Sequence, residues 1–70
     1  MSIKTSFAKK VYCKRKEKNI TQEELAEIVS ISSRWLQEIE RGNNLPSAVV
    51  TLKLIIVLEL DVSELMEDLD

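Results

Sequence analysis

The chain has 70 residues, of which 44% are hydrophobic, 31% are charged and only 4% are aromatic, and its formal net charge is -2. This length favours one domain over residues 1–70, with a core of mainly aliphatic side chains and no second lobe for a small-molecule ligand. The single cysteine and the absence of histidine exclude an internal disulfide, a zinc site and histidine-based catalysis. We therefore expect no metal, no cofactor and no enzymatic activity.

The charges are unevenly distributed along the chain. Seven of the ten basic residues lie in positions 1–18, whereas six of the twelve acidic residues lie in positions 59–70. A basic end can face nucleic acid despite the negative net charge, although a solvated helix face would have the same composition.

Neither a signal peptide nor a membrane span is expected. The N-terminus lacks an apolar segment, and the longest apolar run, residues 54–58, is too short to cross a bilayer. The sequence predicts a cytoplasmic protein with no membrane partner.

The first part of the chain predicts two helices. Ile3, Phe7 and Val11 are four residues apart with charges between them, which is typical of an amphipathic helix running to about residue 18. Thr21 and Glu24 form a capping-box pattern, in which each side chain accepts a hydrogen bond from the backbone N–H of the other residue. This pattern predicts a second helix over residues 22–29.

A third helix is predicted after a short break at residues 30–32. Ser32 is its expected N-cap, and Leu36 and Ile39 turn inward. Gly42 supplies the signal that ends it.

The C-terminal part predicts two more helices. Ser47 can cap a helix that runs to about residue 58, and Asp61 with Glu64 forms a second capping-box pattern before a short helix carrying Leu65 and Leu69. Because no segment alternates like a β-strand, we predict an all-α fold of five short helices.

The second and third predicted helices, separated by about three residues, form a helix-turn-helix pattern. Residues 20–42 read ITQEELAEIVSISSRWLQEIERG. With its TQEELA and IERG runs, this stretch closely resembles the lambda-repressor-like family of DNA-binding proteins, also called the XRE or Cro/CI type. The resemblance continues over residues 44–65 and implies a compact five-helix DNA-binding domain. Ser30 and Glu59 stand where the family usually has glycine, so we expect slightly reshaped turns there.

The resemblance implies that the third helix enters the major groove of DNA. The positions it places against base edges are Ser33, Arg34, Gln37 and Glu38. The guanidinium group of Arg34 can donate to both O6 and N7 of guanine, and Gln37 can pair with adenine. Glu38 can accept from the amino group of cytosine or, instead, repel phosphate. The alternative is that these residues are only a solvated helix face.

The resemblance also implies a set of contacts to backbone phosphates. Gln22 lies at the start of the second helix, where the family holds a phosphate with a side chain and a backbone N–H. The other expected phosphate contacts are Lys10, Lys14, Arg41, Asn43 and Asn44. Generic surface groups would look the same in sequence.

Three further residues have expected structural roles. Arg15 and Glu40 resemble a pair that joins the first helix to the end of the third in this family. Trp35 is expected to pack against neighbouring helices, with a phosphate contact as the alternative. Cys13 has no histidine to activate it and is expected to have no chemical role.

The apolar run at residues 54–58 predicts a surface for a partner. Its side chains span about 400° of helical rotation, so one core face cannot take them all. We expect Leu52 and Ile55, together with Leu58 or Val57, to point inward, and at least one of Ile56 and its neighbours to point outward. The expected homodimer interface comprises Ile56, Val57, Leu60, Leu65 and Leu69. The alternative is a fourth helix buried on all sides.

These features together predict a sequence-specific transcriptional regulator. We expect a repressor or controller protein that binds double-stranded DNA at a palindromic operator as a homodimer. The alternative is an antitoxin-like interaction module that binds another protein and also binds DNA.

Overall fold

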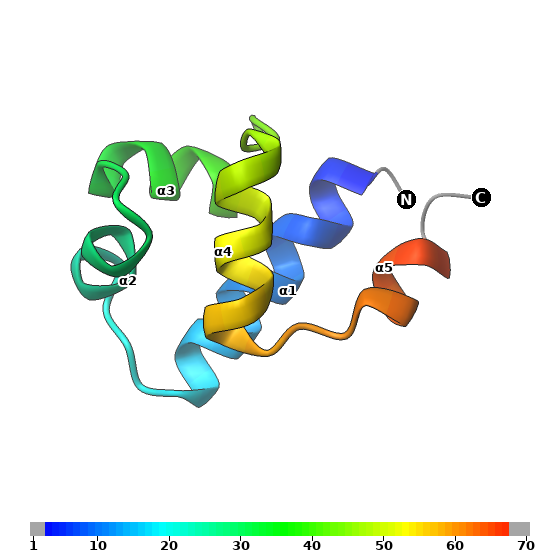
Figure 1. Ribbon diagram of the computed structural model, residues 1–70. Helices are drawn as coiled ribbons and strands as arrows, with labels where there is room; N and C mark the ends of the chain where they lie inside the picture. Colours follow the sequence, from blue (N-terminus) through cyan, green and yellow to red (C-terminus); the bar gives the residue numbers. More distant parts are fainter. Residues whose placement is uncertain (1–2, 68–70) are drawn as a thin grey trace.

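The computed structural model describes residues 3–67, which form five α-helices and no β-strand. The helices are α1 (Ile3–Glu17), α2 (Gln22–Val29), α3 (Ser33–Glu40), α4 (Ala48–Leu58) and α5 (Val62–Glu67). In Figure 1, α4 crosses the front of the molecule, with α2 and α3 on one side of it and α5 on the other. The predicted all-α fold is confirmed, and none of the helices in residues 3–67 is long and apolar enough to cross a membrane.

The starts of α2, α3 and α4 are capped as the sequence predicts. Thr21 Oγ1 accepts a hydrogen bond from the backbone N–H of Glu24 at 3.1 Å, and Glu24 Oε1 accepts one from the backbone N–H of Thr21 at 3.0 Å. These hydrogen bonds hold the pKa of Glu24 below its ordinary value because they favour the charged carboxylate. Ser32 caps α3 and Ser47 caps α4 through their side-chain oxygens.

The cap of α5 differs in detail from the predicted capping box. Asp61 Oδ1 accepts from the backbone N–H of Ser63 at 2.9 Å. The carboxylate of Glu64 lies 3.7 Å from Lys10 Nζ. The side chain of Glu64 thus links α5 to α1.

The two residues that stand where the family usually has glycine adopt the left-handed backbone conformation. Ser30 ends α2 with φ 61°, and Glu59 ends α4 with φ 56°. The backbone N–H of each points back to the last carbonyls of its helix, as in a glycine C-cap. Gly42 follows α3 with φ 80°, which is the helix stop predicted for it.

The core lies between α1 and the other helices. α1 packs against α3, α4 and α5, while α2 packs against α3 and α4. Phe7, Val11, Leu36 and Ile39 are buried, as their spacing predicts. Among the residues that the structure describes, the buried hydrophobic ones are Phe7, Ala8, Val11, Leu25, Ala26, Val29, Leu36, Ile39, Val50, Leu54, Leu58, Leu60 and Leu65.

α4 buries a different face from the one expected. Its core positions are Val50, Leu54 and Leu58, which recur every four residues, and the prediction that Leu52 points inward is wrong because Leu52 is 59% exposed. The prediction that at least one of Ile56 and its neighbours points outward is confirmed, since Ile56 is 73% exposed. α4 is therefore not buried on all sides.

Two members of the expected dimer surface need correction. Leu60 and Leu65 are buried against the chain's own core, because the turn after α4 folds α5 back onto α1. Neither side chain is available to a partner. Val57 is half-buried, and Leu69 lies outside the described residues.

Candidate functional site

The exposed face of α3 gathers the four residues that the sequence assigns to base contacts. Leu36 and Ile39 of α3 are buried, so the opposite side of the helix projects from the molecule. Arg34 lies on that side and is exposed. Around it are the half-exposed Ser33, Gln37 and Glu38. Among residues 3–67, no hydrogen bond or ion pair engages the Arg34 side chain, which leaves its guanidinium group available to a ligand.

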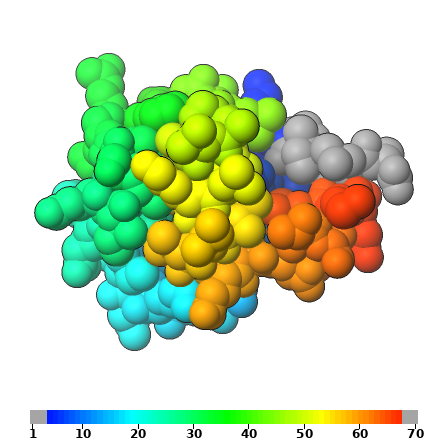
Figure 2. Space-filling view, viewed as in Figure 1, coloured from blue at the N-terminus to red at the C-terminus, as the bar shows by residue number. Residues whose placement is uncertain are grey.

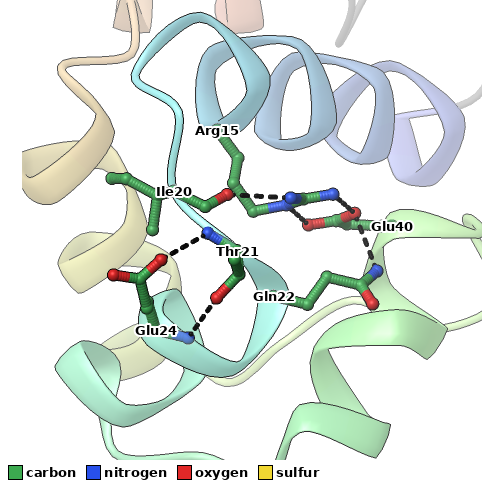
Figure 3. A network of polar contacts seen from close by, with 6 residues as sticks. All are labelled: Arg15, Ile20, Thr21, Gln22, Glu24 and Glu40. Carbon is green, nitrogen blue, oxygen red and sulfur yellow. Dashed lines mark hydrogen bonds and ion pairs between the residues drawn. The ribbon is translucent and has the colours of Figure 1, made fainter.

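A polar network beneath this face joins three segments of the chain (Figure 3). Arg15 Nε donates to Glu40 Oε2 at 2.7 Å, and a terminal guanidinium nitrogen donates to Glu40 Oε1 at 3.0 Å. The other terminal nitrogen of Arg15 donates to the carbonyl oxygen of Ile20 at 2.9 Å. The expected pair is therefore bidentate, and it ties α1 to the end of α3 and to the segment before α2.

This pair is buried. The Arg15 and Glu40 side chains are 6% and 4% exposed. The hydrogen bonds to Glu40 raise the pKa of Arg15 above its ordinary value, although burial acts in the opposite direction. The two side chains thus hold each other in place through paired hydrogen bonds.

Gln22 belongs to the same network. Its side-chain Nε2 donates to Glu40 Oε1 at 3.1 Å, so Glu40 fixes the orientation of the amide (Figure 3). A hollow of about 420 Å³ lies next to it, and the residues that line it are Tyr12, Gln22, Gln37, Glu40 and Arg41. The start of α2 and the exposed face of α3 therefore share one surface, which also includes Tyr12 of α1.

Glu38 is engaged by two residues predicted to contact phosphates. Asn43 Nδ2 donates to Glu38 Oε2 at 2.6 Å, and an Arg41 nitrogen lies 3.5 Å from Glu38 Oε1. Asn44 is exposed in the loop that follows. The carboxylate of Glu38 thus has a fixed position at the C-terminal part of the α3 face.

Lys10 and Lys14 lie on a different side of α1 from this surface. Each is roughly 160° around the helix from Tyr12. Together with Leu60, Asp61 and Glu64 they line a hollow between α1 and the α5 region. This placement argues against direct phosphate contacts from Lys10 and Lys14.

Other sequence expectations have clear structural counterparts. Trp35 is half-buried and packs against the core, in agreement with the packing interpretation. Cys13 is exposed and has no disulfide partner among residues 3–67. The sequence reasoning missed Tyr12, although its spacing of three residues before Arg15 would have placed it on the same side of α1.

The comparisons with known proteins agree with this geometry. Residues 8–67 match the family model described as a helix-turn-helix domain. The chain is 41% identical over 59 residues to YazB of Bacillus subtilis (strain 168), named an uncharacterized HTH-type transcriptional regulator, and the match covers 84% of this chain and 86% of YazB.

A phage protein and a solved structure are also similar. The chain is 38% identical over 52 residues to the ImmF control region 10 kDa protein of Bacillus phage phi105, a match covering 74% of this chain but only 58% of the phage protein. The fold matches the crystal structure of the clp gene regulator ClgR from Corynebacterium glutamicum with a TM-score of 0.83 and 24% identity, over 97% of this chain and 72% of ClgR.

Proposed function

The chain belongs to the helix-turn-helix family of transcriptional regulators, and on that premise we propose that it recognises a specific DNA sequence through α3 as a repressor or controller of transcription. The expectation of an XRE-like regulator rather than an enzyme is confirmed. The site of action would be the cytoplasm. The observation that carries the proposal is the α3 face, where Arg34 projects without a partner among residues 3–67, next to Ser33, Gln37 and Glu38.

α3 is proposed to lie in the major groove with these side chains against base edges. Arg34 donates to O6 and N7 of a guanine, a pairing worth about 1 to 3 kcal/mol of discrimination against other bases. Gln37 pairs with adenine. Ser33, in the first turn of α3, contacts a neighbouring base.

Glu38 is proposed to accept from the amino group of a cytosine. The hydrogen bond from Asn43 supports this role, because it orients the carboxylate through Oε2, while Oε1, among residues 3–67, has only the longer 3.5 Å contact with the exposed Arg41. In this proposal Asn43 positions the Glu38 carboxylate, in addition to its predicted contact with a phosphate.

The phosphate backbone is proposed to run past the start of α2 and the end of α3. Gln22 offers the backbone N–H groups of the first turn of α2, where the helix dipole also favours an anion. Arg41 is exposed at the other end of the same surface, with Asn44 beyond it. These contacts position the protein on DNA without reading its sequence.

A homodimer on a palindromic operator is the proposed functional unit. Val49, Leu52 and Ile56 form a stripe along one side of α4, with exposures of 63%, 59% and 73%. Apolar side chains this exposed on so small a domain favour coverage by a partner. In the proposal a second copy covers the stripe at Ile56, with Val57 at its edge, and two-fold symmetry sets the recognition helices about 34 Å apart.

The same stripe supports a second candidate, an antitoxin-like module in which a different protein covers α4. Sedimentation of the purified chain separates the two candidates. A dimer at micromolar concentration favours the second copy, whereas a monomer that still binds DNA favours a different protein on this face.

Selection of bound duplexes from a random pool at stated salt tests the proposed function. The expected result is an enriched motif with two-fold symmetry and half-sites about 10 base pairs apart. Enrichment of an asymmetric single site would remove the palindromic dimer from the proposal. No enrichment would contradict sequence-specific binding itself.

A further inference from the structure

Tyr12 occupies a position on α1 that no predicted role explains. Its side chain is 45% exposed, although large aromatic rings are usually covered. It lines the same hollow as Gln22, Gln37 and Arg41, which are residues of the proposed DNA-facing surface. The hydroxyl group of Tyr12 is thus a hydrogen-bond donor at the α1 edge of that surface.

Two cationic side chains lie near the aromatic ring of Tyr12. The guanidinium carbon of Arg15 lies 5.5 Å from the ring centroid, and Lys16 Nζ lies 5.9 Å from it. The Arg15 guanidinium group is fixed in position, because it donates hydrogen bonds to both Glu40 and the Ile20 carbonyl oxygen. The Tyr12 ring therefore has a fixed neighbour in Arg15.

The lysines in the second half of α1 and just after it differ in their partners. Lys10 lies 3.7 Å from Glu64, Lys14 lies 4.0 Å from Glu17, and Lys18 lies 3.2 Å from Glu59. Lys16 has no carboxylate partner within residues 3–67 and instead approaches the Tyr12 ring. Its charge is thus the one least neutralised by the protein among these four.

Lys16 also lies beside the start of α2. It lines a second hollow together with Thr21 and Gln22, and the exposed Glu23 lies at the same hollow. Gln22 therefore lines both hollows, one of which it shares with Tyr12 and the other with Lys16.

We infer that Tyr12 and Lys16 bind a phosphate of the DNA backbone together with the N-terminal turn of α2 at Gln22. The tyrosine hydroxyl and the lysine ammonium donate to the phosphate oxygens, in the manner of other phosphate-contacting side chains. This site replaces Lys10 and Lys14 as the α1 contact. The inference depends on the proposed function, since its ligand is the backbone of the bound DNA.

The test uses a fluorescein-labelled random-sequence DNA duplex and the full chain, with anisotropy titrations across KCl from about 50 to 200 mM. Lys16→Gln should lower the slope of log affinity against log salt by about 0.9, the value for one phosphate contact. Lys16→Arg should keep the wild-type slope. Lys10→Gln and Lys14→Gln are the matched controls on the α5 side and should leave the slope close to wild type.

Tyr12→Phe separates the hydroxyl from the ring. It should weaken binding about three- to tenfold without changing the salt slope, because a neutral donor is lost and no charge is removed. Melting temperatures of Lys16→Gln, Lys16→Arg and Tyr12→Phe should stay close to wild type, since Lys16 and Tyr12 are exposed.

Two results would overturn the inference: a Lys16→Gln slope equal to wild type, or a Tyr12→Phe affinity equal to wild type. A lowered slope in Lys10→Gln or Lys14→Gln with an unchanged slope in Lys16→Gln would return the contact to the α5 side of α1. Failure of the wild-type chain to bind any duplex at the lowest salt would contradict the proposed function instead.

Discussion

Removal of the Glu40 carboxylate tests how the domain holds α1, the start of α2 and the end of α3 together. Glu40→Ala leaves the Arg15 guanidinium in a site that is only 6% exposed, with the Ile20 carbonyl as its one remaining partner in the network. Breaking such a buried pair on one side costs about 3 to 5 kcal/mol of stability. Because Arg15 keeps one hydrogen bond, we expect a cost of about 3 kcal/mol for Glu40→Ala. A domain of this size has a total stability of only about 4 to 10 kcal/mol. The loss is therefore a large fraction of the whole.

Thermal melts followed by circular dichroism measure this cost. At roughly 4 to 8 °C for each kcal/mol in a domain of this length, Glu40→Ala should melt about 12 to 24 °C below wild type. Glu67→Ala removes an exposed acid and is the matched control, with a melting temperature close to wild type. The double variant Arg15→Met with Glu40→Leu should recover much of the loss, because no unpaired buried charge remains. Equal melting temperatures for Glu40→Ala and Glu67→Ala would show that the Arg15–Glu40 pair makes no net contribution to stability.

Four single substitutions test a backbone conformation, an exposed apolar side chain and two hydrogen-bonded carboxylates. Ser30→Gly should raise stability by about 1 kcal/mol in urea unfolding, because glycine adopts the left-handed conformation at φ 61° without strain; a destabilised variant would contradict this. Ile56→Lys should remain folded and sediment as a monomer, and a folded variant as dimeric as wild type would remove Ile56 from the interface. Asn43→Ala should change the base preference at the position read by Glu38, whereas a purely phosphate-contacting Asn43 would lower affinity for all sequences alike. The pKa of Glu24 is lowered in the fold, so its carboxylate stabilises the fold at pH values above the pKa of the unfolded chain. This contribution is lost as the pH falls through the folded pKa. The melting temperature should therefore fall toward acid less steeply in Glu24→Gln than in wild type.

Helix boundaries could be predicted from sequence because their signals are local. Thr21, Ser32 and Ser47 cap their helices through residues three positions away, and the spacing of Phe7 and Val11 marks the buried side of α1. The Arg15–Glu40 pair joins residues 25 positions apart, and only the family resemblance made it predictable.

The exposed surfaces were harder to predict because they depend on how the helices pack. α4 is apolar over most of its length, so periodicity alone did not show that Val50, rather than Leu52, joins Leu54 and Leu58 in the core. Leu60 is buried because α5 folds back onto α1, a long-range packing that no local pattern encodes. The same packing turns Lys10 toward α5 and leaves Tyr12 beside α3.

In the proposed function, the side chains of α3 contact base edges, and Arg34 contacts a guanine directly. The most direct measurement compares the binding profiles of wild type, Arg34→Lys and Arg34→Ala on a pool of randomised duplexes at one stated salt concentration. If α3 reads bases through Arg34, Arg34→Ala loses the preference for guanine at one position of each half-site while preferences at the other positions persist, and Arg34→Lys only weakens this preference. Profiles that match at every base, with only the overall affinity lowered, would assign Arg34 to the phosphate backbone instead.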